Sequence, residues 1–219
     1  MTENEQRAAQ EEFNKRFAAE QEAQRQLHQQ LLDAQRHAAI AQQALNEAPR
    51  LLYAAIVAVD ERGAFSKEGQ IPWHYPEDFK WFKTHTTNQI CVMGRTTYDG
   101  INTSLGDKAQ ESVLPKRKCF VVTSSPLPRP NATVLSSLRE LEQHLTDDDQ
   151  HKTIFICGGE RLYSEGIAKC NRVFVTVVNK DVDGDRFFPV NYLQKHFSQT
   201  KVFKVDTAPD LRFTIWDRT

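Results

Sequence analysis

No apolar run in this chain of 219 residues approaches the roughly 20 residues that a membrane-spanning helix needs, and the N-terminus lacks the apolar stretch of a signal peptide. Neither sign of charge dominates, since 28 Lys and Arg oppose 29 Asp and Glu. A formal charge of −1 gives no global basic field to hold nucleic acid or an anionic membrane. We therefore expect a cytoplasmic protein with no nucleic-acid and no membrane partner.

Cysteine is also scarce. The 4 cysteines lie far apart in the sequence, and most of them sit in apolar runs. Their spacing fits no zinc site and predicts reduced thiols in the core rather than disulfides. We expect no metal centre.

Residues 1–48 contain no glycine and no proline and are rich in Ala and Gln, a composition that favours a long helix. Apolar residues recur there at heptad spacing, although Glu20 and Gln24 interrupt the seam. The seam residues are Phe13, Leu27, Ala34 and Ala41 at one position and Phe17, Leu31, Ala38 and Leu45 at the other. Two interpretations remain open: a helix that associates with itself or docks on a protein partner, and a solvated or partly disordered tail.

The composition changes at Pro49, so we divide the chain into an extension, residues 1–49, and a domain, residues 50–219. In the domain, short β-rich runs alternate with helical segments, a pattern typical of an α/β fold whose sheet is covered by helices. The expected strands are Leu51–Val59, Ile90–Gly94, Cys119–Thr123, Thr153–Cys157, Val173–Val178, Lys201–Val205 and Arg212–Trp216.

Helices are expected from about Pro76, Arg95, Ser137 and Glu160. Ser137 followed by Glu140 has the pattern of a capping box, which predicts the start of the third helix. Polar and proline-rich composition predicts surface loops at 102–113 and 124–131.

One short carboxylate lies among large apolar rings at the start of the helix that Pro76 opens. Asp78 falls in the first turn, and Phe79 and Phe82, spaced by three, are expected to share an inward face beside it. Alone, this arrangement favours an acid that merely complements the positive end of the helix dipole. The fixed spacing of Trp73, Pro76, Asp78 and Phe82 after an apolar strand and a Gly-containing loop favours a functional site instead.

Six motifs follow one another in a fixed order through residues 51–219. They are Ile71-Pro72-Trp73, Pro76-x-Asp78, Val92-Met93-Gly94-Arg95-x-Thr97-Tyr98, Leu114-Pro115-Lys116-Arg117, Cys157-Gly158-Gly159 and Gly184-Asp185-x-x-Phe188-Pro189. On these motifs the domain resembles dihydrofolate reductase. The resemblance implies a central, mostly parallel twisted sheet of about eight strands with an antiparallel C-terminal strand, flanked by about four helices.

The resemblance also implies an activity. Members of that family reduce 7,8-dihydrofolate to 5,6,7,8-tetrahydrofolate, with hydride transfer from NADPH to carbon 6 and protonation of nitrogen 5. The implied catalytic residues are Asp78, Thr176 and Tyr163. NADPH is the expected cofactor and dihydrofolate the expected small-molecule partner.

The pterin of the substrate needs a planar pair of acceptors, a role that the resemblance gives to Asp78 with Thr176 in support. Arg117 matches the cation that binds the carboxylate of the glutamate tail. The implied apolar walls are Ile56, Phe79, Phe82, Ile101 and Leu114. Alternatives remain open for each, because Thr176 also suits a buried strand, Arg117 an exposed surface and the apolar residues an ordinary core.

A strand followed by Gly158-Gly159 and a helix lets bare backbone approach a pyrophosphate, although it is not the Gly-x-Gly-x-x-Gly fingerprint. Arg95, with Thr123 and Ser124, matches the family's pocket for the adenosine-side phosphate. The positive charge of such a pocket favours NADPH, which carries this phosphate, over NADH, which does not. The alternatives are a helix-capping arginine at 95 and a packing role for Tyr163. The implied cofactor-binding residues are Ala58, Phe65, Ser66, Gln70, Ile71, Arg95, Thr96, Thr97, Thr123, Ser124, Cys157, Gly158, Gly159, Glu160, Arg161, Leu162 and Tyr163.

The sequence departs from the family pattern at three positions. Ser66 stands where the flexible loop often has glycine, and Phe65 is bulkier than the usual aliphatic residue beside nicotinamide. Lys116 replaces the glycine common before the tail-binding arginine. Two rival functions remain: another pterin or pyrimidine reductase of the same fold, such as that of riboflavin synthesis, which lacks the cluster around Asp78, and an assembly module with an incidental reductase site.

Overall fold

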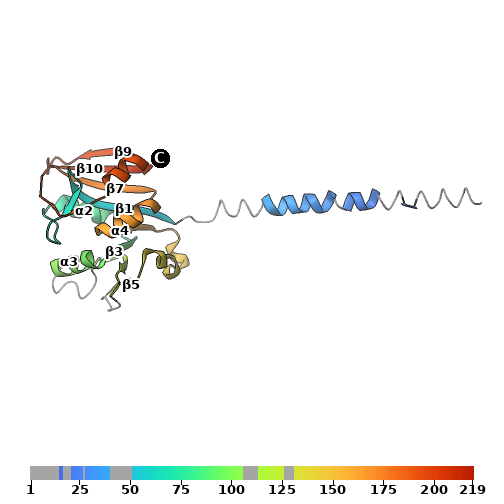
Figure 1. The fold of residues 1–219 in the computed structure, drawn as a ribbon, viewed down its shortest axis with the longest axis horizontal. Helices are drawn as coiled ribbons and strands as arrows, with labels where there is room; N and C mark the ends of the chain where they lie inside the picture. The colour runs from blue at the N-terminus through green and yellow to red at the C-terminus, as the bar shows by residue number, and fades with distance from the viewer. Residues whose placement is uncertain (1–14, 17–20, 27, 40–50, 106–112, 126–130) are drawn as a thin grey trace, which may run out of the picture. The chain divides into compact units, whose positions relative to one another are not determined.

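The computed structural model describes residues 15–16, 21–26, 28–39, 51–105, 113–125 and 131–219 (Figure 1). The chain divides into two compact units, Met1–Pro49 and Arg50–Thr219. In the first unit the described residues are helical and exposed, which confirms part of the long helix. Of the predicted seam, Leu31, Ala34 and Ala38 are described, and Leu31 is 57% exposed. The other seam positions and Glu20 lie outside the described residues.

The second unit is built on an eight-stranded sheet with the order β5-β4-β3-β6-β1-β7-β10-β9. Neighbouring strands are parallel except that β10 runs antiparallel to both β7 and β9, which confirms the predicted sheet. The strands are β1 (Leu52–Asp60), β3 (Ile90–Gly94), β4 (Lys118–Val122), β5 (Thr133–Leu135), β6 (Thr153–Ile156), β7 (Arg172–Val178), β9 (Phe197–Lys204) and β10 (Leu211–Arg218). A small second sheet pairs β2 (Ala64–Ser66) with β8 (Arg186–Phe187).

Helices cover both faces of the large sheet, and the side chains of β1 are accordingly buried on both faces. Its side chains alternate between two apolar clusters, because successive residues of a strand point to opposite faces. One cluster holds residues of α4 (Glu160–Gly166), η4 (Ile167–Lys169), η2 (Leu138–His144) and α5 (Val190–His196). The other cluster packs against α2 (Pro76–Thr86) and α3 (Arg95–Leu105). A short 3-10 turn, η3, spans Asp147–Asp149.

Several local predictions are wrong. Ser137 makes no capping hydrogen bond; Glu140 instead accepts from the backbone and hydroxyl of Ser136, and the segment is the 3-10 helix η2. Residues 102–105, predicted as loop, extend α3, while 106–112 and 126–130 lie outside the described residues. The sequence prediction also missed α5, β5 and the β2–β8 pair.

All 4 cysteines are buried as free thiols. Within the described residues, no group of three or more His, Cys, Asp and Glu side chains is placed to hold a metal ion. None of the helices described there has the length and apolarity to cross a membrane.

Candidate active site

Asp78 lies in the first turn of α2, where its carboxyl group is tied to the centre of the sheet. The Oγ1 of Thr176, a residue of β7 that is 1% exposed, donates a hydrogen bond of 2.7 Å to Oδ1 of Asp78. Burial raises the pKa of Asp78 above its ordinary value, and the bond from Thr176 partly opposes this rise. No described residue donates to Oδ2 of Asp78, so this oxygen remains available to a ligand.

Local sequence explains this placement. Tyr75 has extended backbone angles as the N-cap of α2, and Pro76 occupies the first helical position, where its missing N–H costs nothing. Thr176 pairs in register with Ala58 of β1 on one side and with Phe213 of β10 on the other. The acid is therefore held beside β7, next to the carboxyl end of β1.

Four of the five predicted wall residues share one apolar cluster on the α2 and α3 face: Ile56, Phe82, Ile101 and Leu114. Phe79 does not join them, because its side chain is 50% exposed and its ring lies 5.3 Å from that of His74. The predicted shared inward face of Phe79 and Phe82 is thus wrong. A half-exposed ring next to Asp78 is nevertheless accessible to a ligand.

Arg117 is fixed at the far end of the helix that carries Asp78. Its Nε and Nη2 each donate to Oγ1 of Thr86 over 3.2 Å, and its Nη1 donates to the carbonyl of Pro115 over 2.6 Å. Thr86 is fully buried at the end of α2. Thr86 thus anchors the guanidinium group of Arg117. With a rise of about 1.5 Å per residue, Asp78 and Thr86 lie roughly 12 Å apart along the helix. No local pattern in the sequence predicts this role of Thr86.

Most of the predicted cofactor residues follow the carboxyl ends of neighbouring parallel strands, which meet at one edge of the sheet. Ala58 lies near the end of β1, Arg95 to Thr97 follow β3, Thr123 and Ser124 follow β4, and Cys157 to Tyr163 follow β6. The structure therefore brings these segments of the sequence to the same edge.

At this edge two glycine backbones pack closely. The N–H of Gly94 donates to the carbonyl of Gly158 over 2.7 Å. Gly158 has φ +112°, and a Cβ there would lie 3.2 Å from Oγ1 of Thr97. A side chain would fill the space in front of this turn, so the site fits a group that bare backbone approaches, such as a pyrophosphate.

The loop with Phe65 and Ser66 is docked beside the same edge. The carbonyl of Ser66 accepts from the N–H of Asp185 over 2.9 Å, and the carboxylate of Asp185 accepts from the N–H of Glu68 over 3.1 Å. The ring of Phe65 meets that of Tyr163 edge-on at 5.5 Å. The bulky ring of Phe65 thus packs against Tyr163, and Ser66 is buried.

Other predicted cofactor residues are engaged with the protein. Tyr163 is buried and its hydroxyl donates to the carbonyl of Ile56 over 2.8 Å, the packing role left open above. Arg95 pairs with Asp99 at 3.2 Å. The side chain of Arg161, which is 88% exposed, pairs with Glu165. The remaining placements are these: Leu162 in the core, Glu160 accepting from the N–H of Phe187, Gln70 paired through its backbone with Lys67, and Ile71, Thr96 and Ser124 exposed.

Comparison with known proteins gives a consistent result. The family model described as dihydrofolate reductase matches residues 52–218. A dihydrofolate reductase of Bacillus subtilis is 32% identical over 135 residues, 61% of this chain and 73% of that protein. One of Haemophilus influenzae is 28% identical over 171 residues, 77% of this chain and 99% of that protein.

A solved structure is also similar. Dihydrofolate reductase from Enterococcus faecalis, complexed with NADP(H) and RAB-propyl, matches with a TM-score of 0.63 and 28% identity. The match covers 77% of this chain and 96% of that one.

Proposed function

Because this chain belongs to the dihydrofolate reductase family, an oxidoreductase family, we propose that it reduces 7,8-dihydrofolate to 5,6,7,8-tetrahydrofolate with NADPH. One observation carries the proposal: a buried carboxyl group, supported by Thr176, lies at the start of α2 with one oxygen open to a ligand. The family membership and the NADP(H) complex of the structural relative support the choice of substrate and cofactor.

Asp78 orients the substrate in this proposal. Its carboxylate accepts hydrogen bonds from the amino and ring N–H groups of the pterin, a planar match that an exposed carboxylate would share with water. In a site of low dielectric the same negative charge stabilises the positive charge that nitrogen 5 gains on protonation, and the protonated ring is the better acceptor of a hydride at carbon 6. Thr176 fixes the carboxyl group, so that little reorganisation is needed during the reaction.

The cofactor would lie along the carboxyl-end edge of the sheet. The backbone of Gly158 and Gly159 offers close approach to the pyrophosphate, and Arg95 with Thr97 and Thr123 offers a cation and hydroxyl groups to phosphate. When bound there, NADPH supplies the hydride. Tyr163 braces the edge against β1 through its bond to Ile56.

An assay of NADPH oxidation with and without dihydrofolate tests the proposal. The purified protein is expected to oxidise NADPH only when dihydrofolate is present, and to leave the pyrimidine substrate of the riboflavin-type reductases untouched. Oxidation that ignores dihydrofolate, or that requires the pyrimidine, would overturn the proposal. We further place the reaction in the cytoplasm, as the composition favours, which fractionation of the source cells tests.

We also propose that residues 1–48 associate with a second copy of the chain, because the described helix presents Leu31 and Leu32, 57% and 45% exposed, without a partner among the described residues of its own chain. Deleting residues 1–48 is expected to lower the mass in light scattering from that of a dimer of the full chain to that of a single shortened chain, and to leave the reductase active. An unchanged mass would contradict self-association, and lost activity would show that the domain of residues 50–219 is not independent.

A further inference from the structure

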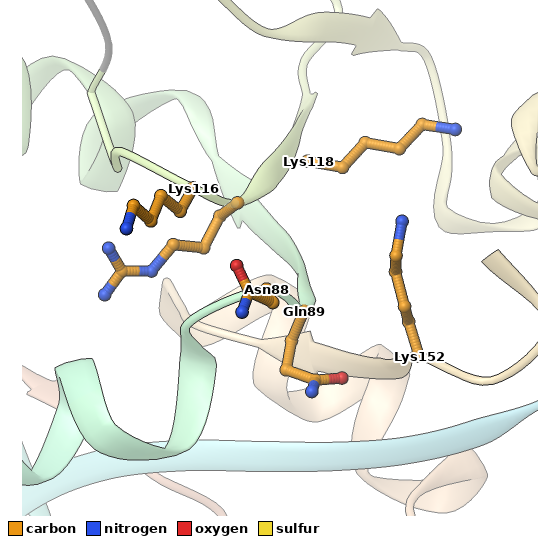
Figure 2. A pocket seen from close by; sticks show the side chains of 6 residues that line it. Asn88, Gln89, Lys116, Lys118 and Lys152 are labelled. Carbon is orange, nitrogen blue, oxygen red and sulfur yellow. The ribbon is translucent and has the colours of Figure 1, made fainter. Parts of the chain in front are cut away.

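A pocket of about 300 Å³ lies beside the guanidinium group of Arg117. It is lined by Asn88, Gln89, Lys116, Arg117, Lys118 and Lys152 (Figure 2). No acidic residue is among these lining residues. In a chain of formal charge −1, four cations around one pocket are a local excess that favours a ligand with several negative charges.

Two of these cations already have a carboxylate partner. Lys118 and Lys152 both donate to Asp149, a residue that is 1% exposed, and Lys118 also donates to the carbonyl of His144 over 3.0 Å. In Figure 2 their side chains lie on the opposite side of the view from Lys116. Asp149 thus compensates one of these two charges, and both ammonium groups are held in place by the fold.

Lys116 differs from this pair. Its ammonium group is exposed and has no acidic partner among the described residues. Its backbone has φ +64°, a left-handed conformation that is strained for a lysine and unstrained for glycine. The N–H of Asn88 donates to its carbonyl over 2.8 Å, which holds this conformation. A lysine kept at a position that suits glycine indicates a use for its charge.

Arg117, the residue after Lys116, has N–H groups that, among the described residues, remain free to bind a ligand. Thr86 and Pro115 engage Nε and one N–H on each terminal nitrogen. Each terminal nitrogen carries a second N–H, and together these present a fork to one carboxylate. Lys116, the preceding residue, places a further cation at the next position along an extended ligand.

We propose that Lys116 and this pocket bind the second and later carboxylates of a dihydrofolate whose tail carries more than one γ-linked glutamate. The proposal rests on the proposed function, because Arg117 then holds the first carboxylate of the same tail. Lys118 and Lys152, which are paired with Asp149, line the opposite wall of the pocket. Specificity for tail length is thus set away from the pterin, so it affects substrate binding and leaves the chemical step unchanged.

The test compares monoglutamyl and triglutamyl dihydrofolate in steady-state kinetics at low salt. The wild-type protein is expected to have a KM for the triglutamyl substrate about 3- to 10-fold lower, at equal kcat. Lys116→Gln is expected to remove most of this preference while leaving KM for the monoglutamyl form within about twofold. Lys201→Gln, at an exposed lysine of β9, is the matched control and should keep the full preference.

The outcomes separate the two claims. Turnover of monoglutamyl dihydrofolate by the wild-type protein confirms the proposed function whatever the preference for tail length. With that turnover present, equal KM values for the two substrates, or a preference that survives in Lys116→Gln, overturns the pocket assignment. Free citrate serves as a further probe: if it abolishes the preference at concentrations near KM, the pocket is a general anion site and the assignment is wrong.

Discussion

Replacing Asp78 with Asn is expected to make the folded protein more stable at neutral pH. Burial raises the pKa of Asp78, so the folded state favours its protonated form. That contribution to stability is present below the ordinary pKa of an aspartic acid and is lost as the pH rises through the raised pKa of the folded state. At neutral pH, above the ordinary pKa of an aspartic acid, the buried carboxyl group therefore makes the fold less stable than a neutral side chain of the same shape would.

Asn carries no charge but keeps an oxygen for the hydroxyl of Thr176, so the hydrogen bond of 2.7 Å can persist. Relief of the buried charge is expected to contribute of the order of 1 kcal/mol. For a chain of this size that raises Tm by about 2–4 °C.

Thermal unfolding monitored by circular dichroism from about pH 3 to pH 8 measures this effect. The gain in Tm should appear near neutral pH and shrink toward pH 3, where both side chains are neutral. Glu77→Gln is the matched control, because Glu77 lies one residue away, accepts from the Thr207 hydroxyl at the surface, and should change stability by no more than about 0.5 kcal/mol. A variant that is less stable at pH 7, or a gain that does not depend on pH, would refute the reasoning.

Three further substitutions test the remainder of the site. Gly158→Ala places a Cβ 3.2 Å from Oγ1 of Thr97 at a φ of +112°, so it should destabilise the fold by more than about 1 kcal/mol and weaken NADPH binding. An unchanged Tm and an unchanged NADPH affinity in fluorescence titrations would contradict the proposal that the backbone of Gly158 and Gly159 binds the pyrophosphate. Arg95→Gln should lower the preference for NADPH over NADH by about 10- to 100-fold in kcat/KM, and an intact preference would place the phosphate elsewhere. Thr86→Val should loosen Arg117 and raise KM for dihydrofolate about tenfold at unchanged kcat, whereas an altered kcat alone would contradict a positioning role.

The sheet could be predicted because its central strands are apolar runs with little ambiguity. Strand β3 matches its predicted range, Ile90–Gly94, and the helices from Pro76, Arg95 and Glu160 begin where proline or strand ends require. The elements that were missed are short: β5 has 3 residues and β8 has 2, too few for periodicity to show.

The site was less predictable, since its details depend on contacts between distant segments. The spacing of Phe79 and Phe82 places them on one helix side, but the direction in which that side faces depends on how α2 packs. The bond between Arg117 and Thr86 joins residues 31 apart and has no local signature. The cap at Ser137 failed because Ser136, one residue earlier, competes for the same glutamate.

The most direct measurement of the central claim is the rate of hydride transfer in a single turnover of NADPH and dihydrofolate, compared between the wild-type protein and Asp78→Asn. The account predicts that NADPH binds both proteins equally and that transfer in the variant falls by at least about 100-fold at neutral pH. Equal transfer rates in the two proteins would contradict it.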